Sequence, residues 1–320
     1  MSKPVIWIPR RLSDATIARA RRDYDVILTE DDTPGTPDEI VAMSSRVDAM
    51  IPCHSERFSA EVVARLDPRL RIVANHSVGV DHCDLDALKS AGIMVTNTPD
   101  VLSDATAELA MLLMLGAARH AVSADRLVRQ GEWDSWSPSF MVGKQVTGGR
   151  VGIVGMGRVG RAFAEKARGF GMEIHYHNRS QLSSEVEQGA IFHRDLDDLL
   201  EVSDFLTLHC PATSDTIDLL DATRIAKLPE GAVVVNTARG ALVDEDALLA
   251  AIRSGHIAAA GLDCFKREPG GNPAFARHEN IFMLPHIGSA TVSTRDAMGF
   301  RALDNLDAFF AGQEPGDRLV

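Results

Sequence analysis

The sequence predicts an α/β protein with two doubly wound domains, each formed by a parallel sheet with helices on both faces. Three observations lead to this fold class. Short apolar runs alternate with helical patterns in both parts of the chain, which has 320 residues. A chain of this length commonly folds as two domains that each bury a core. A glycine-rich loop follows an apolar run near residue 151, and the first third has no such loop.

The first third of the chain has the βαβα alternation of a parallel sheet. Strand candidates lie at residues 5–8, 26–28, 49–51, 71–74 and 93–95, and helical patterns at 13–22, 37–45, 59–66 and 84–91. Thr36-Pro-Asp-Glu is typical of a helix start with proline in the first turn. We therefore expect a complete small domain here.

A long helical pattern follows, from about Ser103 to Arg129. Its Ala, Leu and Met stripe is explained by core packing, and the helix could also connect the domains. Its longest apolar stretch, 107–118, is too short to span a bilayer. The irregular segment 131–138 contains Trp133 and Trp136, two of only three tryptophans. Exposed aromatic side chains in a loop often mark an interface.

The central motif is Gly155-x-Gly157-x-x-Gly160, placed between the apolar run 151–154 and a helical pattern. The first glycine allows a tight turn, the second lets backbone approach a pyrophosphate, and the third lets helix and strand pack closely. The helix N-terminus then faces the phosphates with unpaired N–H groups. We predict dinucleotide binding by Gly155, Met156, Gly157, Arg158, Val159 and Gly160.

Further strand candidates at 173–178, 190–193, 204–210, 232–237, 258–263 and 281–284 match a Rossmann domain. The last helical pattern covers 291–310. The net charge of −12 argues against nucleic acid or an anionic membrane as a partner. Four cysteines without a C-x-x-C pair indicate reduced thiols in a cytosol, with no metal site or disulfide framework. The N-terminus has no signal-peptide pattern.

Three polar residues follow consecutive strand candidates of the second domain: Arg239, Glu268 and His286. Ligands of open α/β sheets bind beyond the carboxyl ends of the strands. Arg can hold a carboxylate bidentately, His can exchange a proton near neutral pH, and Glu can orient the imidazole. Taken singly, each also has a structural interpretation: a turn residue before proline, a surface charge or a packed histidine. Their joint placement favours a catalytic site.

These residues lie in motifs that resemble the D-isomer-specific 2-hydroxyacid dehydrogenases. The matching stretches are 151–160, 236–244 (Asn-Thr-Ala-Arg-Gly-Ala-Leu-Val-Asp), 261–269, 284–290, Val78-Gly-Val-Asp81 and Asn97-Thr-Pro99. The resemblance spans nearly the whole chain. It implies a Rossmann NAD(P) domain at 99–287, inserted in a flavodoxin-like substrate domain formed by 1–98 and 288–320.

The resemblance also implies roles for individual residues. Arg239, Glu268 and His286 would be catalytic, and the Val78-Gly79 backbone would hold the substrate carboxylate in the interdomain cleft. Hydride would pass from the nicotinamide to C2 of a 2-oxoacid, and His286 would donate the proton. Asp263 would bind the nicotinamide carboxamide. The remaining residues that we assign to the cofactor are Thr106, Cys210, Pro211, Thr237 and Ala238.

The choice of cofactor depends on the residue after the second strand of the Rossmann domain. NAD-binding forms need a carboxylate there, about 20 residues after the first glycine. Position 178 lies 178 − 155 = 23 residues on, and it is Asn178, followed by Arg179 and Ser180. A neutral side chain beside Arg and Ser accommodates a 2′-phosphate. We predict that NADP(H) is preferred; the alternative is that Asn178 binds the ribose of NAD(H).

Within the family, this strand end and the Gly-x-Trp-x-x-Trp loop look most like glyoxylate/hydroxypyruvate reductases. The resemblance implies a homodimer with Trp136 near the opposite active site, and small 2-oxoacids as substrates. His54 is a further candidate for the substrate pocket. Two alternatives stay open: a phosphoglycerate-type dehydrogenase, for which only Arg57 supplies obvious charge near His54, and a non-catalytic, dinucleotide-sensing corepressor-like protein.

Overall fold

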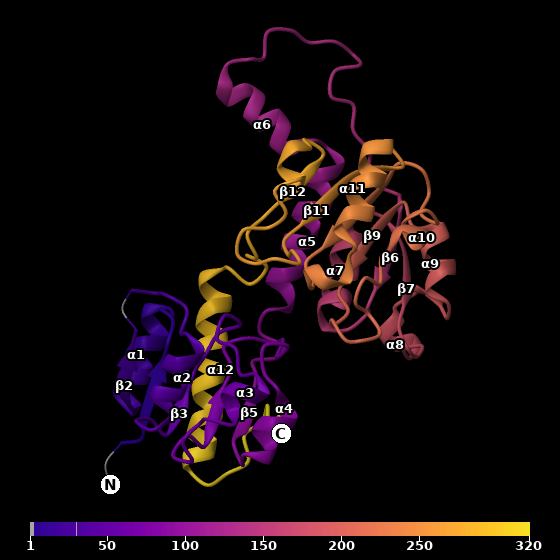
Figure 1. Cartoon of the computed structure of the whole chain (residues 1–320). Coiled ribbons are helices and arrows are strands. Elements are labelled where there is room, and N and C mark those ends of the chain that lie inside the picture. Colours follow the sequence, from indigo (N-terminus) through magenta and orange to yellow (C-terminus); the bar gives the residue numbers. More distant parts are fainter. Residues whose placement is uncertain (1–2, 30) are drawn as a thin grey trace. The chain divides into compact units, whose positions relative to one another are not determined.

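The computed structural model describes residues 3–29 and 31–320, which form two compact units. Unit 1 comprises Met1–Leu102 and Ala290–Val320, and unit 2 comprises Ser103–Ser289. Over the described residues, unit 1 has a five-stranded sheet and unit 2 a seven-stranded sheet, and every strand pair is parallel (Figure 1). The predicted α/β class with two doubly wound sheets is confirmed.

The sheet of unit 1 has the strand order β2-β1-β3-β4-β5, which is the flavodoxin-like order. Its strands are β1 (Val5–Ile8), β2 (Asp25–Leu28), β3 (Ala49–Met50), β4 (Ile72–Ala74) and β5 (Met94–Thr96). Successive side chains of a strand point to opposite faces. Accordingly Ile6 and Ile8 join one hydrophobic core, while Trp7 joins the other.

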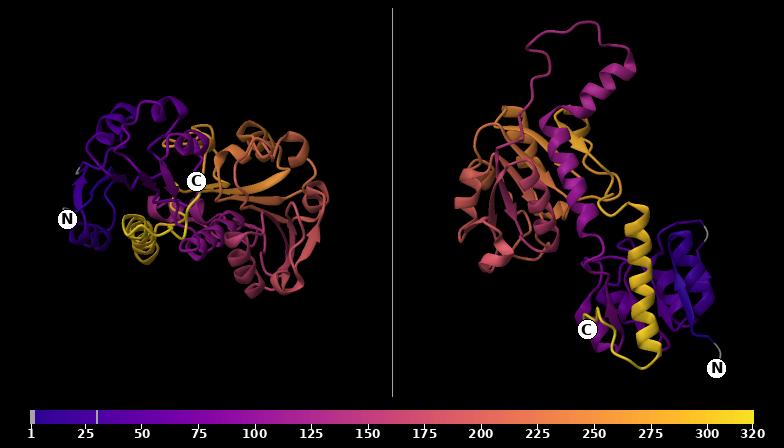
Figure 2. Two further views of the ribbon diagram at one scale, coloured as in Figure 1. Left: turned by 90° about the horizontal axis from the view of Figure 1, so that it is seen from below. Right: turned by 180° about the vertical axis from the view of Figure 1, so that it is seen from behind.

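The helices of unit 1 are α1 (Asp14–Asp23), α2 (Pro37–Ser44), α3 (Ala60–Val63), α4 (Leu85–Ser90) and α12 (Val292–Phe310). As predicted, α2 begins with Pro37, and Thr36 and Glu39 form a capping box. Helix α12 is capped by the Thr291 side chain and packs against α1 and β4 (Figure 2). The chain thus returns to unit 1 after completing unit 2.

The sheet of unit 2 has the order β12-β11-β10-β9-β6-β7-β8, which extends the Rossmann order by one strand. Its strands are β6 (Arg150–Val154), β7 (Glu173–His177), β8 (Ile191–His193), β9 (Phe205–Leu208), β10 (Ala232–Asn236), β11 (Ile257–Leu262) and β12 (Ile281–Met283). The helices are α5 (Ser103–Ala118), α6 (Ala121–Gln130), α7 (Arg158–Gly169), α8 (Ser184–Glu187), α9 (Leu196–Val202), α10 (Ala222–Ile225) and α11 (Glu245–Ser254).

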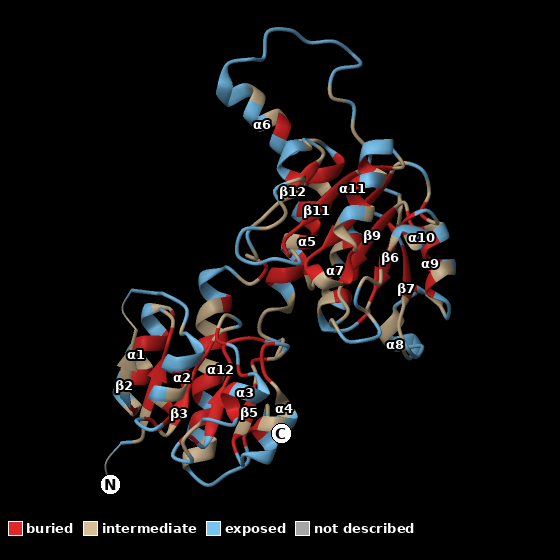
Figure 3. Ribbon diagram, viewed as in Figure 1, coloured by how far each residue is buried: buried red, intermediate tan, exposed pale blue. Residues whose placement is uncertain are grey.

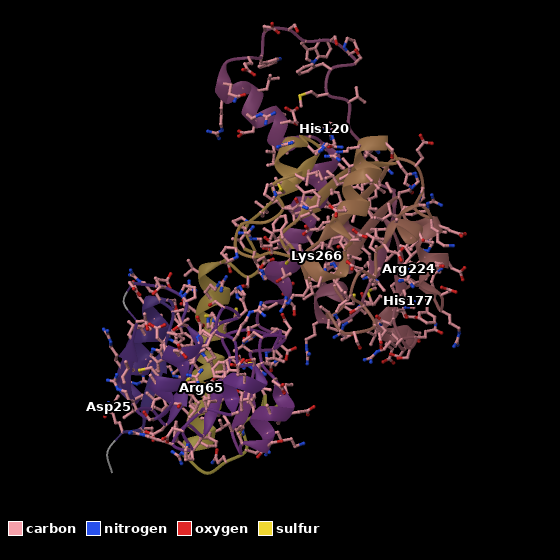
Figure 4. The ribbon with its side chains drawn as sticks, viewed as in Figure 1. Asp25, Arg65, His120, His177, Arg224 and Lys266 are labelled. Carbon is pink, nitrogen blue, oxygen red and sulfur yellow. The ribbon has the colours of Figure 1, made fainter. Side chains whose placement is uncertain are left out.

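The prediction of one continuous helix over 103–129 is wrong, because α5 and α6 meet at an angle of 66°. His120 adopts the left-handed conformation, with φ of 53°. The carbonyl of Ala118 accepts a hydrogen bond from the N–H of Lys144 at 2.8 Å, which occupies a carbonyl that a continuing helix would need. Figure 4 labels His120 at this joint. Beyond it, α6 and the following segment are mostly exposed (Figure 3).

In the part of the chain that the structure describes, no single helix is long and apolar enough to cross a membrane. The bent pair α5 and α6 passes the same test of length and composition when taken together. Most side chains of α5 are buried in unit 2, which is ordinary for the core helix of a folded domain.

Candidate active site

The glycine loop of unit 2 joins β6 to α7 and is built as its sequence predicts. Gly155 has φ of +96°, and a Cβ there would lie 2.6 Å from the backbone nitrogen of Cys210. A Cβ on Gly160 would lie 2.3 Å from the carbonyl oxygen of Gly155. These two positions therefore require glycine on steric grounds. Gly157 differs, since a Cβ there would meet nothing within 4 Å.

This loop fits a dinucleotide pyrophosphate. Gly157 is the N-cap of α7 and makes no side-chain capping hydrogen bond, so the first N–H groups of α7 can serve a ligand. The space beside Gly157 allows backbone to approach that ligand closely. Directly after β10, at the same edge of the sheet, the buried hydroxyl of Thr237 has no hydrogen-bond partner among the described residues. A buried hydroxyl without a protein partner can be paired by a bound ligand or by an ordered water.

Asn178 follows β7, and its side chain is bonded to the glycine loop. Its Oδ1 accepts a hydrogen bond from the N–H of Met156 at 2.7 Å. Because the donor is a backbone N–H, the atom that accepts must be the side-chain oxygen. The other polar atom of the Asn178 side chain is therefore Nδ2, which is a donor. Arg158, Arg179 and Ser180 are exposed around this strand end. Figure 4 labels His177, the last residue of β7.

Arg239 lies in a tight turn after β10 and is the N-cap of the short helix at Gly240–Leu242. The buried side chain of Asn236 fixes this turn, donating to the carbonyl of Arg239 at 2.8 Å and accepting from the N–H of Ala238 at 3.0 Å. A Cβ on Gly240 would lie 1.9 Å from the carbonyl carbon of Phe265. The Arg239 turn is therefore packed directly on the loop that carries Glu268.

His286 and Glu268 are joined by a hydrogen bond, with Nδ1 and Oε2 2.6 Å apart. The other carboxylate oxygen, Oε1, accepts from the N–H of Phe265 at 2.7 Å. Since a carboxylate only accepts, His286 carries a proton on Nδ1 and presents Nε2 as the second ring nitrogen. The predicted pairing of an acid and an imidazole at neighbouring strand ends is thus a direct contact.

Asp263 directly follows β11 and is almost fully buried. Its two carboxylate oxygens accept from the N–H groups of Ile287 and Gly288, both at 2.8 Å. Burial raises the pKa of Asp263, and the two backbone hydrogen bonds oppose that shift. The carboxylate therefore holds the turn that contains His286, a role that the sequence does not reveal.

The other residues assigned to the cofactor lie at the same edge of the sheet in unit 2. Cys210 and Pro211 follow β9, Ala238 follows β10, and Thr106 lies on α5. A Cβ on Gly288 would lie 3.4 Å from the Thr106 hydroxyl, so Thr106 adjoins the His286 turn. Burial raises the pKa of the Cys210 thiol to about 11, which keeps it protonated.

Unit 1 contains three further candidates, Val78, Gly79 and His54, in loops at the carboxyl ends of its own strands. Val78 and Gly79 follow β4, and Val78 is exposed. His54 is exposed in the turn after β3. That turn is held by Glu56, which is fully buried and accepts from the N–H of Cys53 at 2.8 Å. Glu56 was not predicted, since nothing in its sequence neighbourhood marks it as a buried carboxylate.

Trp136 lies in the segment between α6 and β6, with 73% of its surface exposed. Trp133 and Val142 of the same segment, and Val128 of α6, are also more than half exposed. Several large exposed apolar side chains close together in the sequence are typical of an association surface. The described residues of unit 2 do not cover them.

Comparisons with known proteins agree with this geometry. The family model described as "D-isomer specific 2-hydroxyacid dehydrogenase, NAD binding domain" matches residues 111–288. A glycerate dehydrogenase from Hyphomicrobium methylovorum is 42% identical over 316 residues, covering 98% of each chain. A glyoxylate reductase from Pyrococcus horikoshii is 40% identical over 318 residues, covering 98% of this chain and 95% of the relative.

The chain belongs to the D-isomer specific 2-hydroxyacid dehydrogenase family. Among solved structures, an NADPH-dependent glyoxylate/hydroxypyruvate reductase from Sinorhizobium meliloti, in complex with NADP and malonate, has a TM-score of 0.88 and 32% identity. The match covers 100% of this chain and 97% of that one. Membership of this dehydrogenase family confirms the resemblance that the sequence motifs indicated.

As an oxidoreductase of this family, the protein uses a nicotinamide dinucleotide, and the residues assigned to that cofactor above lie in unit 2. Sequence reasoning missed His209, whose backbone lies against Gly155. Its Nε2 lies 3.0 Å from the Thr207 hydroxyl, and burial lowers its pKa to about 3, so the ring is neutral. The only feature of the sequence that could have indicated His209 is its position directly after β9.

Proposed function

We propose that this dehydrogenase reduces small 2-oxoacids, glyoxylate and hydroxypyruvate, to the D-2-hydroxyacids. The observation that carries the proposal is the contact between His286 and Glu268 at 2.6 Å. A carboxylate that fixes the Nδ1 proton leaves Nε2 to exchange a proton with substrate, as general acid–base catalysis requires. Relatives named glycerate dehydrogenase and glyoxylate reductase support the substrate class.

The bound nicotinamide supplies or accepts the hydride at C2 of the substrate. Each protein residue then has one task. In the direction of reduction, protonated His286 donates from Nε2 to the oxygen that becomes the hydroxyl. Glu268 stabilises the imidazolium by its charge and holds the ring in one orientation. In oxidation, the neutral imidazole takes the same proton back.

The substrate carboxylate needs positive or N–H groups, and two sets are assigned to it. Arg239 offers a planar fork of donors suited to a carboxylate and to the carbonyl oxygen beside it. Asn236 fixes the turn of Arg239, so the backbone that carries the Arg239 side chain has a defined position. In unit 1, the amides of Val78 and Gly79 bind the carboxylate, and His54 lines the substrate pocket.

NADP(H) is the preferred cofactor in this proposal, with NAD(H) as the second choice. Asn178 uses its oxygen on Met156, so the group that it can offer to a ribose is the Nδ2 donor. A donor suits a 2′-phosphate, whose oxygens only accept, and Arg179 and Ser180 add charge and a hydroxyl. Family relatives include NADPH-dependent enzymes.

We further propose a homodimer that covers Trp136 and Trp133, and a cytosolic location. Trp136 would lie near the active site of the partner. The exposed apolar side chains on α6 and the following segment support self-association. The cytosolic location rests on four free cysteines, because thiols stay reduced in a cytosol. Light scattering should give a mass of twice 34.6 kDa, and Trp136→Ser should shift it toward the monomer.

The decisive assay follows absorbance at the nicotinamide band. NADPH and NADH are each tested with glyoxylate and with hydroxypyruvate. Oxidation of NADPH by either acid, abolished in His286→Ala while cofactor binding persists, is the expected result. Absence of turnover with both acids and both cofactors would overturn the proposed substrate class. Full activity of His286→Ala would overturn the assignment of the proton donor.

A further inference from the structure

The loop after β4 in unit 1 has three consecutive carbonyl groups that are each held by a hydrogen bond. The N–H of Thr98 donates to the carbonyl of Ser77 at 3.0 Å. The side-chain amide of Asn97 donates to the carbonyl of Val78 at 2.8 Å. The hydroxyl of Ser77 donates to the carbonyl of Gly79, also at 2.8 Å. Two of the three donors belong to residues that directly follow β5.

Holding these carbonyls sets the direction of the neighbouring N–H groups. In a planar trans peptide, the carbonyl of one residue and the N–H of the next point in opposite directions. The N–H groups of Val78, Gly79 and Val80 therefore point away from Thr98, Asn97 and the Ser77 hydroxyl, respectively. Within residues 3–29 and 31–320, these three N–H groups donate no hydrogen bond.

Asn97 is itself fixed by the C-terminal part of unit 1. Its carbonyl accepts from the side chain of Asn305 on α12 at 3.3 Å, and its N–H donates to the carbonyl of Asp317 at 3.4 Å. Asn305 is almost fully buried and also bonds the carboxylate of Asp317 at 3.0 Å. The backbone of Asn97 is thus held in place, and its side chain donates to the Val78 carbonyl from a fixed position.

We propose that Asn97 and Ser77 are positioning residues that aim the Val78–Val80 amides at the carboxylate of the substrate. The inference rests on the proposed function, in which these amides bind that carboxylate. Several N–H groups of consecutive residues form an anion-binding concavity when the backbone holds them in place. Asn97 and Ser77 supply that hold without touching the substrate.

The test compares Asn97→Ala and Ser77→Ala with the wild type. Each substitution removes one hydrogen bond that fixes an amide, so KM for glyoxylate should rise about tenfold while kcat stays within about threefold. The inhibition constant of malonate, which offers a carboxylate but no reducible carbonyl, should rise by the same factor. The dissociation constant of NADPH should not change, because the glycine loop lies in unit 2.

Matched variants separate positioning from folding. Ser90→Ala removes an exposed hydroxyl that also donates to a backbone carbonyl, that of Asp86 at 2.8 Å, and it should leave KM and kcat unchanged. Ser77→Thr keeps the hydroxyl and should restore KM. If Asn97→Ala fails to fold, Asn97→Asp replaces it, since Asp keeps the shape but loses the donor.

The outcomes distinguish the positioning role of Asn97 and Ser77 from the proposed function of the enzyme. If the wild type is active and both variants keep its KM and its inhibition constant for malonate, the positioning role is overturned. The proposed function is then left intact. A parallel loss of kcat, KM and NADPH binding would also overturn it, since that pattern indicates general disruption. A wild type that turns over no 2-oxoacid would overturn the proposed function itself.

Discussion

The backbone N–H of His286 donates to the carbonyl of Asp263 at 2.9 Å, and the Asp263 carboxylate accepts from the next two N–H groups. Three consecutive residues of the His286 turn are therefore held by one aspartate that directly follows β11. His286 itself has a left-handed backbone, with φ of 54°. Such a conformation is costly for a non-glycine residue and persists only where surrounding contacts impose it.

Asp263→Asn should lower both stability and turnover. The amide can accept only one of the two N–H groups, and its own NH2 then faces the other donor. A buried donor left unpaired costs about 1–3 kcal/mol. For units of this size, that corresponds to a fall in the thermal midpoint of several degrees. The measurements are the thermal midpoint and kcat for glyoxylate.

The same variant separates two roles of Asp263. If the carboxylate acts through the His286 turn, kcat falls much more than NADPH binding does. If it instead contacts the nicotinamide carboxamide, the dissociation constant of NADPH rises as well. Asp195→Asn, at the exposed cap of α9, is the matched control and should leave kcat unchanged. An unchanged kcat in Asp263→Asn would show that the Asp263 carboxylate does not position the His286 turn for turnover.

Much of this site could be predicted from the sequence, because residue type and strand order determine it. Parallel strands bring their carboxyl ends to one edge, so Arg239, Glu268 and His286 could be placed beside the glycine loop. Contacts between distant segments could not be predicted in this way. The break at His120 depends on Lys144 bonding the Ala118 carbonyl 26 positions earlier in the chain.

The burial of Glu56 and the hold of Asp263 on the His286 turn escaped prediction for a related reason, although the family resemblance had assigned Asp263 to the cofactor. Each of these two carboxylates accepts from a backbone N–H group of a separate loop, so the local sequence does not indicate that contact. The Asn178 side chain illustrates the same limit. Its position after β7 was predicted, but its bond to Met156 follows from how closely two strand ends approach.

Glu268→Gln should reduce kcat by about 100-fold or more, in the range of general acid–base contributions. The amide has one oxygen to serve both the His286 ring and the Phe265 N–H, and it carries no charge to stabilise the imidazolium. In Glu268→Gln combined with His286→Ala, kcat should be no lower than in His286→Ala alone, because residues that act as a unit are not additive.

The control for this pair is Glu185→Gln, an exposed residue of α8, which should leave kcat unchanged. Multiplicative losses in the double variant would show that Glu268 acts independently of the imidazole. The rates should be measured at saturating NADPH and glyoxylate so that binding effects are excluded.

Asn178→Asp should move cofactor preference toward NADH. One carboxylate oxygen can keep the bond to the Met156 N–H, while the other accepts from ribose hydroxyls and repels a 2′-phosphate. Placing like charges together costs several kcal/mol, so the ratio of kcat/KM for NADPH to that for NADH should fall about 100-fold or more. Arg179→Gln should weaken NADPH alone. An unchanged ratio in both variants would refute the predicted NADP(H) preference.

Two glycines of α7 should respond oppositely to alanine. A Cβ at residue 160 would lie 2.3 Å from the Gly155 carbonyl oxygen, so Gly160→Ala should lower the thermal midpoint and weaken NADPH binding about tenfold or more. Gly169→Ala lies in the same helix with nothing within 4 Å, and it should stabilise by about 0.5–1 kcal/mol. Calorimetry with and without NADPH measures both. Equal effects of the two substitutions would contradict the close packing at Gly160.

Acid should destabilise the protein partly through His76, which is buried in unit 1 and bonds the Arg295 carbonyl at 3.4 Å. Burial, with the charge of Arg295, lowers the pKa of His76 from 6.5 to about 4. The folded state thus keeps the ring neutral while the unfolded chain takes up a proton below about pH 6.5. The free energy of unfolding must therefore fall as the pH drops from 6.5 to 4, by at most about 3 kcal/mol. His76→Gln keeps a donor for Arg295 but does not titrate, so its thermal midpoint should fall less over this window. Parallel curves for the two proteins would show that His76 does not contribute.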